Sequence, residues 1–237
     1  MESYHPWVTP YNEDGTLKYN IKSWKNYTMD PTPLSNPLQD NKYNNVTDLK
    51  NNLFGSFSAT LKPFKWLSFS STNTLTLTNV NTNDYLDSRT YSGNHSRNEM
   101  SNGVLKVDDE RSWTFLTSNI LRLQHSFGEH NLSGLVGQEW YERHTRSSHI
   151  EMYDQMIAGE RNVGGFSKQG DKTNPAVIPT GAERESGSFS VFSEVNYNYA
   201  GKYMASASFR TDGSTNFGKD NRYGTFYSFS GSWLVSR

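Results

Sequence analysis

The residues most able to carry out chemistry are scattered along this chain rather than gathered into a pattern. Its six histidines include His144 and His149, which lie five residues apart in a polar stretch. No HExxH arrangement places two histidines on one helical face, as a zinc protease requires. Surface histidines in loops are commoner than metal ligands. We therefore predict no metal site here.

Other candidate motifs are incomplete. Residues 165–173 nearly match a phosphate-binding loop, but Asp171 puts a carboxylate where phosphate charge must be cradled. Asp108, Asp109 and Glu110 could act as paired carboxylates in glycoside cleavage, although an acidic run is more often solvated surface. Residues 12–15 lack the spaced ligands of a calcium loop. We expect no catalytic residues, no metal and no cofactor, and hence not an enzyme.

Composition narrows the class of protein. The 237 residues carry a net charge of −1 and no cysteine, with 33% hydrophobic and 14% aromatic residues. A charge so close to zero argues against a nucleic-acid surface, which needs a basic excess. Without cysteine there is no disulfide scaffold and no thiolate zinc site. Disordered chains are poor in aromatic residues, so the abundance of rings favours a folded, β-rich protein.

Alternation with a period of two is the strongest structural signal. In the run from Trp66 to Asn79, the even positions from Ser68 to Thr78 are all Ser or Thr, while the odd positions include Leu67, Phe69 and Leu75. A helix would mix these faces because its period is 3.6 residues. Such runs span about ten to fourteen residues, the length of strands that cross a membrane at a tilt. Similar runs occur in 53–61, 111–125, 131–141, 188–199, 203–210 and 223–235.

The connections alternate between short and long. Short turns are expected at 62–65, 126–130 and 200–202, with long polar segments between them. Outer-membrane barrels have short periplasmic turns and long extracellular loops. Aromatic residues near the short turns, such as Trp66, Tyr197, Tyr199 and Tyr203, suit an interfacial girdle. We predict an outer loop at 1–48, a hairpin at 49–79, an outer loop at 80–110, a hairpin at 111–142, an outer loop at 143–187, and a hairpin plus the next strand at 188–237.

The final fifty residues carry a distinctive set of positions: Arg210, Asp212, Gly213, Ser214, Phe217, Gly218, Arg222, Gly224, Phe226, Ser228 and Trp233. At these positions the chain resembles the barrel of SusC/RagA-type TonB-dependent outer-membrane transporters of Bacteroidota. Tyr227 departs from the pattern, because the family usually has Pro there. We interpret the matching residues as structural. The resemblance implies an all-β fold, an antiparallel up-and-down transmembrane barrel of about 22 strands, of which this chain supplies about seven.

The same resemblance implies function. The whole protein would sit in the outer membrane, pair with a SusD-like surface lipoprotein, and import oligosaccharides or peptides with energy from TonB. TonB would act through an N-terminal part that this sequence does not show, since no signal peptide, TonB box or plug is apparent in it. Loop aromatics could stack on a ligand, namely Trp7, Tyr11, Tyr85, Tyr91 and Tyr153.

Physical reasoning adds expectations about the barrel wall. Hydroxyl faces should line the lumen and apolar faces should meet lipid, with Glu194, Arg210 and Asp212 on the lumen side. Arg210 and Arg222 could pair with Asp212 or Asp220. Gly213 and Gly218 would occupy turns with positive φ. Seven strands leave open edges, so this piece alone should aggregate or stay disordered.

Two other functions stay open. A soluble carbohydrate-binding β-sandwich explains the Ser, Thr, Asn and aromatic content, but not the strand length or the loop asymmetry. A passive outer-membrane porin needs no plug and explains the strands equally well.

Overall fold

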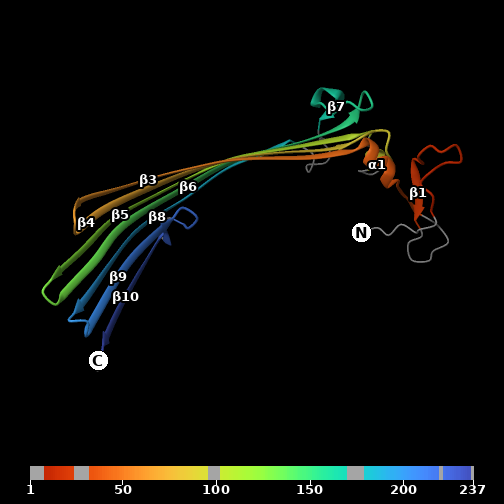
Figure 1. Cartoon of the computed structure of the whole chain (residues 1–237). Coiled ribbons are helices and arrows are strands. Elements are labelled where there is room, and N and C mark those ends of the chain that lie inside the picture. The colour runs from red at the N-terminus through yellow and green to blue at the C-terminus, as the bar shows by residue number, and fades with distance from the viewer. Residues whose placement is uncertain (1–7, 24–31, 96–101, 170–178, 219–220, 236–237) are drawn as a thin grey trace. The chain divides into compact units, whose positions relative to one another are not determined.

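The structure is a computed structural model that describes residues 8–23, 32–95, 102–169, 179–218 and 221–235 (Figure 1). Seven long strands form one antiparallel meander, and each hydrogen-bonds to its neighbour in sequence except that β8 follows β6 in the sheet. The short β7 pairs with β6 beside this path. The long strands are β3 (Asn45–Phe64), β4 (Leu67–Leu86), β5 (Val104–Phe127), β6 (His130–Gln155), β8 (Thr180–Tyr199), β9 (Tyr203–Ser214) and β10 (Tyr223–Trp233).

This architecture confirms the predicted fold class, an antiparallel β-sheet of barrel type. Three connections in it are tight: residues 65–66 join β3 to β4, residues 128–129 join β5 to β6, and residues 200–202 join β8 to β9. Gly128 (φ 59°) turns the chain between β5 and β6, and Gly201 (φ 65°) does so between β8 and β9. Both have the left-handed backbone that glycine adopts without a steric penalty. Ala200, beside Gly201, also has positive φ (53°).

Several strands are longer than the sequence pattern suggested. The segments 80–110 and 143–187, expected to be loops, contain the ends of β4, β5, β6 and β8. In these extensions both parities carry polar residues, so the alternation that marks a strand disappears. Backbone pairing continues because a ladder needs only its N–H and C=O groups, whatever the side chains.

The shorter elements lie among the segments expected to be loops. The expected first loop contains β1 (Asn20–Ser23), β2 (Thr32–Ser35) and α1 (Pro37–Tyr43). Asn36 caps α1, its side chain accepting a hydrogen bond from the Leu38 amide. Later come α2 (Tyr91–His95), η2 (Val163–Gly165) and β7 (Phe166–Gln169). Within the described ranges, no helix is long and apolar enough to cross a membrane.

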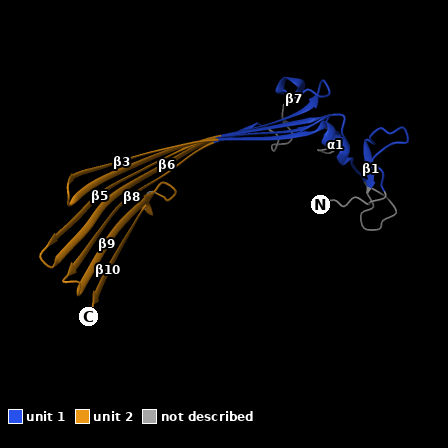
Figure 2. Cartoon of the chain, in the orientation of Figure 1, with its two compact units in different colours: residues 1–51, 79–110, 147–182 blue, residues 52–78, 111–146, 183–237 orange. Residues whose placement is uncertain are grey.

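The chain divides into two compact units (Figure 2). Unit 1 comprises residues 1–51, 79–110 and 147–182, and unit 2 comprises residues 52–78, 111–146 and 183–237. Unit 1 contains a buried apolar cluster of Tyr85, Leu105, Met152 and Phe166. The described buried hydrophobic residues all belong to unit 1, so unit 2 lacks a comparable core among its described residues.

Unit 2 is a two-faced sheet. Residues that pair directly across antiparallel strands share a face, and Ser190 pairs with Asp212, which pairs with Gly224. We call this the polar face: Ser190, Glu194, Asn196, Ser206, Ser208, Arg210, Asp212, Ser228 and Ser230. The opposite, apolar face holds Phe189, Val191, Val195, Tyr199, Tyr203, Ala207, Phe209, Tyr223, Tyr227, Phe229 and Trp233.

Candidate functional site

Arg210 organises the polar face at the centre of the C-terminal motif. Its Nε donates to Asp212 Oδ1 at 2.7 Å and to Oδ2 at 3.0 Å. Its Nη2 reaches Ser190 Oγ at 3.3 Å on β8 and lies 3.6 Å from Glu139 Oε2 on β6. The guanidinium also lies 5.4 Å from the ring centroid of Phe192. One arginine therefore contacts three strands, and its expected pairing with Asp212 is present.

Hydroxyl pairs extend this polar face along β9 and β10. Ser208 and Ser228 oxygens are 2.8 Å apart, and those of Ser206 and Ser230 are 2.6 Å apart. Phe226 pairs with Arg210 in the register and is 61% exposed. Gly224, Phe226 and Ser228 on β10 thus continue the face of Arg210, whereas the motif residue Trp233 lies on the opposite face.

The prediction that Gly213 and Gly218 occupy positive-φ turns is wrong. Neither has positive φ, and Gly213 lies within β9. A Cβ on Gly213 would lie 2.6 Å from a ring carbon of Tyr223, so glycine is needed there because the ring approaches closely. At Gly218 a Cβ would meet nothing within 4 Å.

Among the described residues, Arg222 contacts backbone groups of the connection between β9 and β10. Its Nε donates to the carbonyl of Phe217 at 3.4 Å, across the connection between β9 and β10. The amide of Ser214 donates to the carbonyl of Arg222 at 3.0 Å. The other proposed partner, Asp220, lies outside the described residues. Arg222 therefore closes the loop through backbone carbonyls.

The residues predicted to stack on a ligand differ in how exposed their side chains are. Tyr85 and Tyr153 are only 2% and 8% exposed, so the prediction that their rings stack on a ligand is wrong. Tyr85 lies in the extension of β4 and Tyr153 in the extension of β6, where the side chains of unit 1 pack together. Tyr11 is 47% exposed. Trp7 lies outside the described residues.

Tyr91 belongs to a ring cluster in unit 1. Its ring stacks on His95 at 3.9 Å with an interplanar angle of 9°, and Tyr19 meets it edge-on at 5.7 Å. Asn94 Nδ2 donates to the Tyr19 hydroxyl at 2.8 Å. Of these three rings, only Tyr91 was predicted from the sequence as a candidate for ligand stacking. Tyr19 comes next to it only in the folded chain.

A buried polar network in unit 1 has no counterpart in the sequence-based predictions. Asp87, with no exposed surface, accepts two bonds from the Arg89 side chain at 2.8 Å and one from Tyr85 Oη at 2.6 Å. Gln155 Nε2 donates to Tyr85 Oη. The Arg89 guanidinium lies 4.2 Å from the ring centroid of Tyr43. The only sequence signal is an Asp-Ser-Arg run after a strand.

Electrostatics favour the charged form of Asp87. Burial works against the carboxylate, but the hydrogen bonds from Arg89 and Tyr85 outweigh it and lower the pKa of Asp87 to about 2. The same contact with Asp87 raises the pKa of Arg89. The pair therefore stays ionised at neutral pH and fixes the chain after β4.

The candidate histidines are paired with carboxylates. His144 Nε2 lies 2.8 Å from Glu183 Oε1, and His149 Nδ1 lies 2.6 Å from Asp108 Oδ1. The acidic run 108–110 lies within β5 rather than at a loop end. Across the described part of the chain, no three metal-binding side chains come together. Residues 165–169 of the phosphate-loop-like segment end η2 and form β7, and residues 170–173 lie outside the described residues.

The known proteins that are similar to this chain in sequence are TonB-dependent receptors. The chain is 28% identical over 233 residues to TonB-dependent receptor P26 of Formosa agariphila, a match to 95% of this chain and 22% of that protein. It is 33% identical over 125 residues to TonB-dependent receptor P3 of the same organism, covering 52% of this chain and 12% of that one. The chain therefore spans less than a quarter of these relatives. No protein-family model matches it.

Solved structures share the fold. The structure of the RagAB peptide transporter matches 94% of this chain and 23% of that chain, with a TM-score of 0.71 and 19% identity. The RagAB peptide importer in its "open-open" state gives a TM-score of 0.68 and 20% identity over the same shares. These matches show that the chain shares the fold of the matched part of these transporters.

Proposed function

We propose that this chain, which is similar to TonB-dependent receptor P26 of Formosa agariphila along 95% of its length, forms part of the barrel wall of an outer-membrane importer of the SusC/RagA type. The observation that carries this proposal is the two-faced sheet of unit 2. One face is lined by hydroxyls and paired charges, and the other by exposed aromatic and aliphatic side chains. A sheet of this kind suits a wall between water and lipid.

A row of aromatic rings runs along the apolar side near the short turns. The ring centroids of Phe127 and His130 are 5.0 Å apart, and those of His130 and Tyr199 are 4.7 Å apart. Tyr199 stacks with Tyr203 at 6.3 Å, and Tyr203 with Trp233 at 6.1 Å. The row crosses five strands. Such continuity is expected of a girdle at a membrane interface.

A second set of rings lies ten residues along three of these strands. Trp140 on β6 and Phe189 on β8 meet edge-on at 6.1 Å, and Tyr223 lies at the start of β10. At ~3.3 Å per residue and a tilt of ~40°, ten residues rise about 25 Å, the height of the apolar band of an outer-membrane barrel. The pairs are His130 with Trp140, Tyr199 with Phe189, and Trp233 with Tyr223.

The polar face then lines the route of a hydrophilic solute. Serine and threonine pairs continue on β3 and β4, where the oxygens of Ser56 and Thr74 are 3.2 Å apart and those of Ser58 and Thr72 are 3.1 Å apart. Hydroxyls accept and donate weakly, so they keep water at the wall without binding one solute tightly. Arg210 is held by Asp212 and Glu139 and acts as a fixed part of this wall.

We further propose the partners that the resemblance implies. A SusD-like surface lipoprotein would deliver oligosaccharides or peptides, and TonB would supply energy through parts of the protein beyond this sequence. On this chain the rings of Tyr11, Tyr91 and Tyr19 are the accessible candidates for stacking on a sugar or peptide. Aromatic stacking of this kind recurs wherever a polar ligand has an apolar ring face.

The test uses the complete protein that contains this chain. Cells that lack it are compared with complemented cells for uptake of labelled oligosaccharides and of labelled peptides, with and without a protonophore. Energised import predicts that uptake of one class falls when the gene is deleted and when the proton gradient is collapsed. Uptake that survives the protonophore unchanged would favour a passive porin and contradict the proposal.

A further inference from the structure

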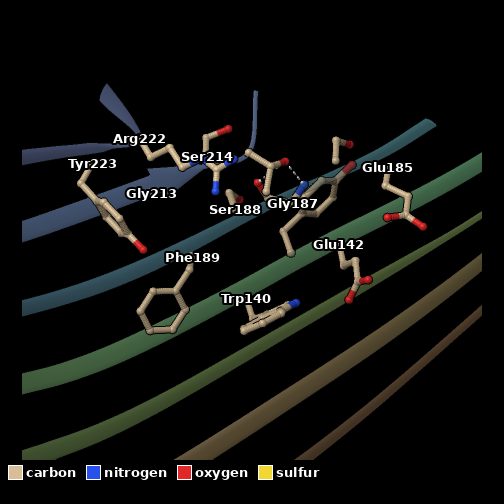
Figure 3. Close-up of a pocket in the computed structure, with 13 residues that line it drawn as sticks. Trp140, Glu142, Glu185, Gly187, Ser188, Phe189, Gly213, Ser214, Arg222 and Tyr223 are labelled. Carbon is tan, nitrogen blue, oxygen red and sulfur yellow. Dashed lines mark hydrogen bonds between the residues drawn. The ribbon is translucent and has the colours of Figure 1, made fainter. Parts of the chain in front are cut away.

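Two hollows in unit 2 differ in which faces of the sheet line them. The first, of about 370 Å³, is shown in Figure 3. Its lining includes Trp140 and Phe189, which meet on the apolar face, together with Ser188 and Ser214, which pair with each other on the polar face. The second hollow, of about 310 Å³, lies near the short turns, and its charged strand residues all belong to the polar face. The second hollow can therefore present these charges to one solute on the water side of the wall.

Side-chain contacts place the cations of the second hollow on one face. The oxygens of Ser58 on β3 and Thr72 on β4 are 3.1 Å apart, and Lys62 lies four residues beyond Ser58 with the same parity. Arg122 Nη1 on β5 donates to Ser70 Oγ at 3.2 Å, and Ser70 lies two residues before Thr72 on β4. Lys62 and Arg122 therefore stand on the same side of three neighbouring strands.

The same face continues across β6 to β8. The Ser126 hydroxyl donates to Asn131 Oδ1 at 2.6 Å, which joins β5 to β6. Asn131 has the same parity on β6 as Glu139, which lies 3.6 Å from Arg210 on the polar face. Glu194 on β8 belongs to that face and also lines the hollow. Since the sheet runs from β3 through β4, β5 and β6 to β8, the cations and Glu194 stand at opposite margins.

The cations of the hollow differ from Arg210, because they have no carboxylate partner. Arg210 Nε lies 2.7 Å from Asp212 Oδ1. Among the described residues, neither Lys62 nor Arg122 forms an ion pair, and both side chains are exposed. Lys65, in the turn between β3 and β4, adds a third cation to the lining. The hollow is therefore basic, and an anion that enters it supplies the missing partner.

Neutral donors complete the lining. The hydroxyl of Ser68 and the side-chain amide of Gln124 belong to it, and the Gln124 backbone amide holds β5 against β4 by donating to the Trp66 carbonyl at 2.8 Å. Glu194 is held on its own strand, because Asn196 Nδ2 donates to its Oε1 at 2.6 Å. Guanidinium, ammonium and hydroxyl donors together satisfy both oxygens of a carboxylate.

We propose that this hollow binds a carboxylate group of the imported solute. The carboxylate pairs with Lys62 and Arg122, while Glu194 at the other margin repels it and keeps the affinity moderate. Because the polar face must line the lumen for a solute to reach it, this site rests on the proposed function. In an importer whose short turns face the periplasm, the site lies near the end of the route. The same group is carried by a uronate of an acidic oligosaccharide and by an acidic side chain of a peptide.

The experiment uses the complete protein purified from outer membranes in mild detergent. Isothermal titration calorimetry compares tetragalacturonate with its methyl ester, which keeps the sugar chain without its charges, and tetraglutamate with tetraglutamine. We expect one of the two carboxylate probes to bind about fivefold more tightly than its neutral counterpart, as two exposed ion pairs would give. The probe with the larger preference identifies the source of the carboxylate.

Three variants assign the preference to the hollow. Lys62→Gln and Arg122→Gln should each lose most of it, while Arg122→Lys, which keeps the charge, should retain it. Lys202→Gln makes the same charge change in the turn between β8 and β9, outside the hollow, and should bind like the wild type. Heat-modifiable migration of each variant shows that the barrel is folded.

Equal binding of the charged and neutral probes by the wild type would overturn the proposal, as would an equal loss of preference in Lys202→Gln. Failure of the proposed transport function is a separate result, since uptake is measured in cells with and without the protonophore. A protein that imports a solute with energy but shows no preference for carboxylates would remove only this site. A passive pore that keeps the preference would remove only the energised import.

Discussion

The two units of this chain are stabilised in opposite ways. In unit 1, polar groups are removed from water and satisfied: Asp87 and Thr90 have no exposed surface, and Gln155 is 4% exposed. In unit 2, large apolar side chains remain open to the surroundings: Phe229 is 78% exposed and Tyr227 is 74% exposed. The first pattern suits a segment that works in water, and the second suits one that works in lipid.

The difference teaches where the free energy of folding comes from in each unit. Unit 1 supplies its own partners, through the cluster around Tyr85 and the ion pair of Asp87 with Arg89. In unit 2 the backbone groups are paired between strands, but the apolar face has no protein partner among the described residues and is left to be covered by lipid. Substitutions should therefore have effects that depend on the unit and, within unit 2, on the face.

The largest effect is expected for Val195→Arg in the complete protein. Val195 lies on the apolar face of β8, near the midpoint between Phe189 and Tyr199, and is 49% exposed. A charge at the lipid midplane costs ~2–4 kcal/mol. The amount of heat-modifiable, folded protein in outer membranes should fall markedly.

Asn196→Arg is the matched control for that variant. It introduces the same side chain at the next residue, which faces the polar side. We expect near-wild-type amounts of folded protein. If both variants lose folded protein equally, the apolar face does not meet lipid.

In unit 1, Asp87→Ala should destabilise the chain that follows β4. The change removes the acceptor of the Tyr85 hydroxyl and the carboxylate that pairs with Arg89. We expect the free energy of unfolding this segment to fall by ~1.5–3 kcal/mol, the contribution of a hydrogen bond to a charged group. Hydrogen exchange of residues 85–95 should speed up. Asp14→Asn, in an exposed turn, should leave that exchange unchanged.

Acid should weaken the same network. The pKa of Asp87 is about 2 in the folded chain, against ~3.9 for an unfolded aspartate. Because the folded pKa is lowered, the stabilisation is complete above ~pH 4 and is lost as the pH falls toward 2. Exchange of residues 85–95 should rise over this interval in the wild type. An equal rise in Asp87→Asn would show that another group is responsible.

A smaller effect is expected for Gly213→Ala. The new Cβ would lie 2.6 Å from the Tyr223 ring, and such overpacking costs ~1–3 kcal/mol before the ring moves aside. Removing the ring in the double variant Gly213→Ala, Tyr223→Ala should restore much of the thermal stability. Gly218→Ala, where the Cβ meets nothing within 4 Å, should be neutral. A Gly213→Ala variant as stable as the wild type would contradict the close approach.

Much of unit 2 could be predicted from the sequence because its two faces differ in chemistry. The alternation of Ser and Thr with Leu and Phe from Trp66 to Asn79 identified a strand, and the short turns near Gly128 and Gly201 followed from the residues around them. The pairing of Arg210 with Asp212 could also be expected, because residues two apart share a strand face.

Unit 1 could not be predicted in this way. Its strand extensions carry polar residues on both faces, so no period of two marked them. The burial of Tyr85 depends on Leu105, Met152 and Phe166, which come from distant parts of the chain. Gly213 was misread for a related reason, since the ring of Tyr223 that requires it belongs to the neighbouring strand.

The most direct test of the two-faced sheet is cysteine labelling along β8 of the complete protein in outer-membrane vesicles. This chain contains no cysteine, so in a version of the complete protein whose other parts are also free of cysteine, single substitutions at residues 190–197 add thiols one at a time. A water-soluble maleimide should label positions 190, 194 and 196 and spare positions 191 and 195. Labelling of both parities to the same extent would contradict a wall with lipid on one side and water on the other.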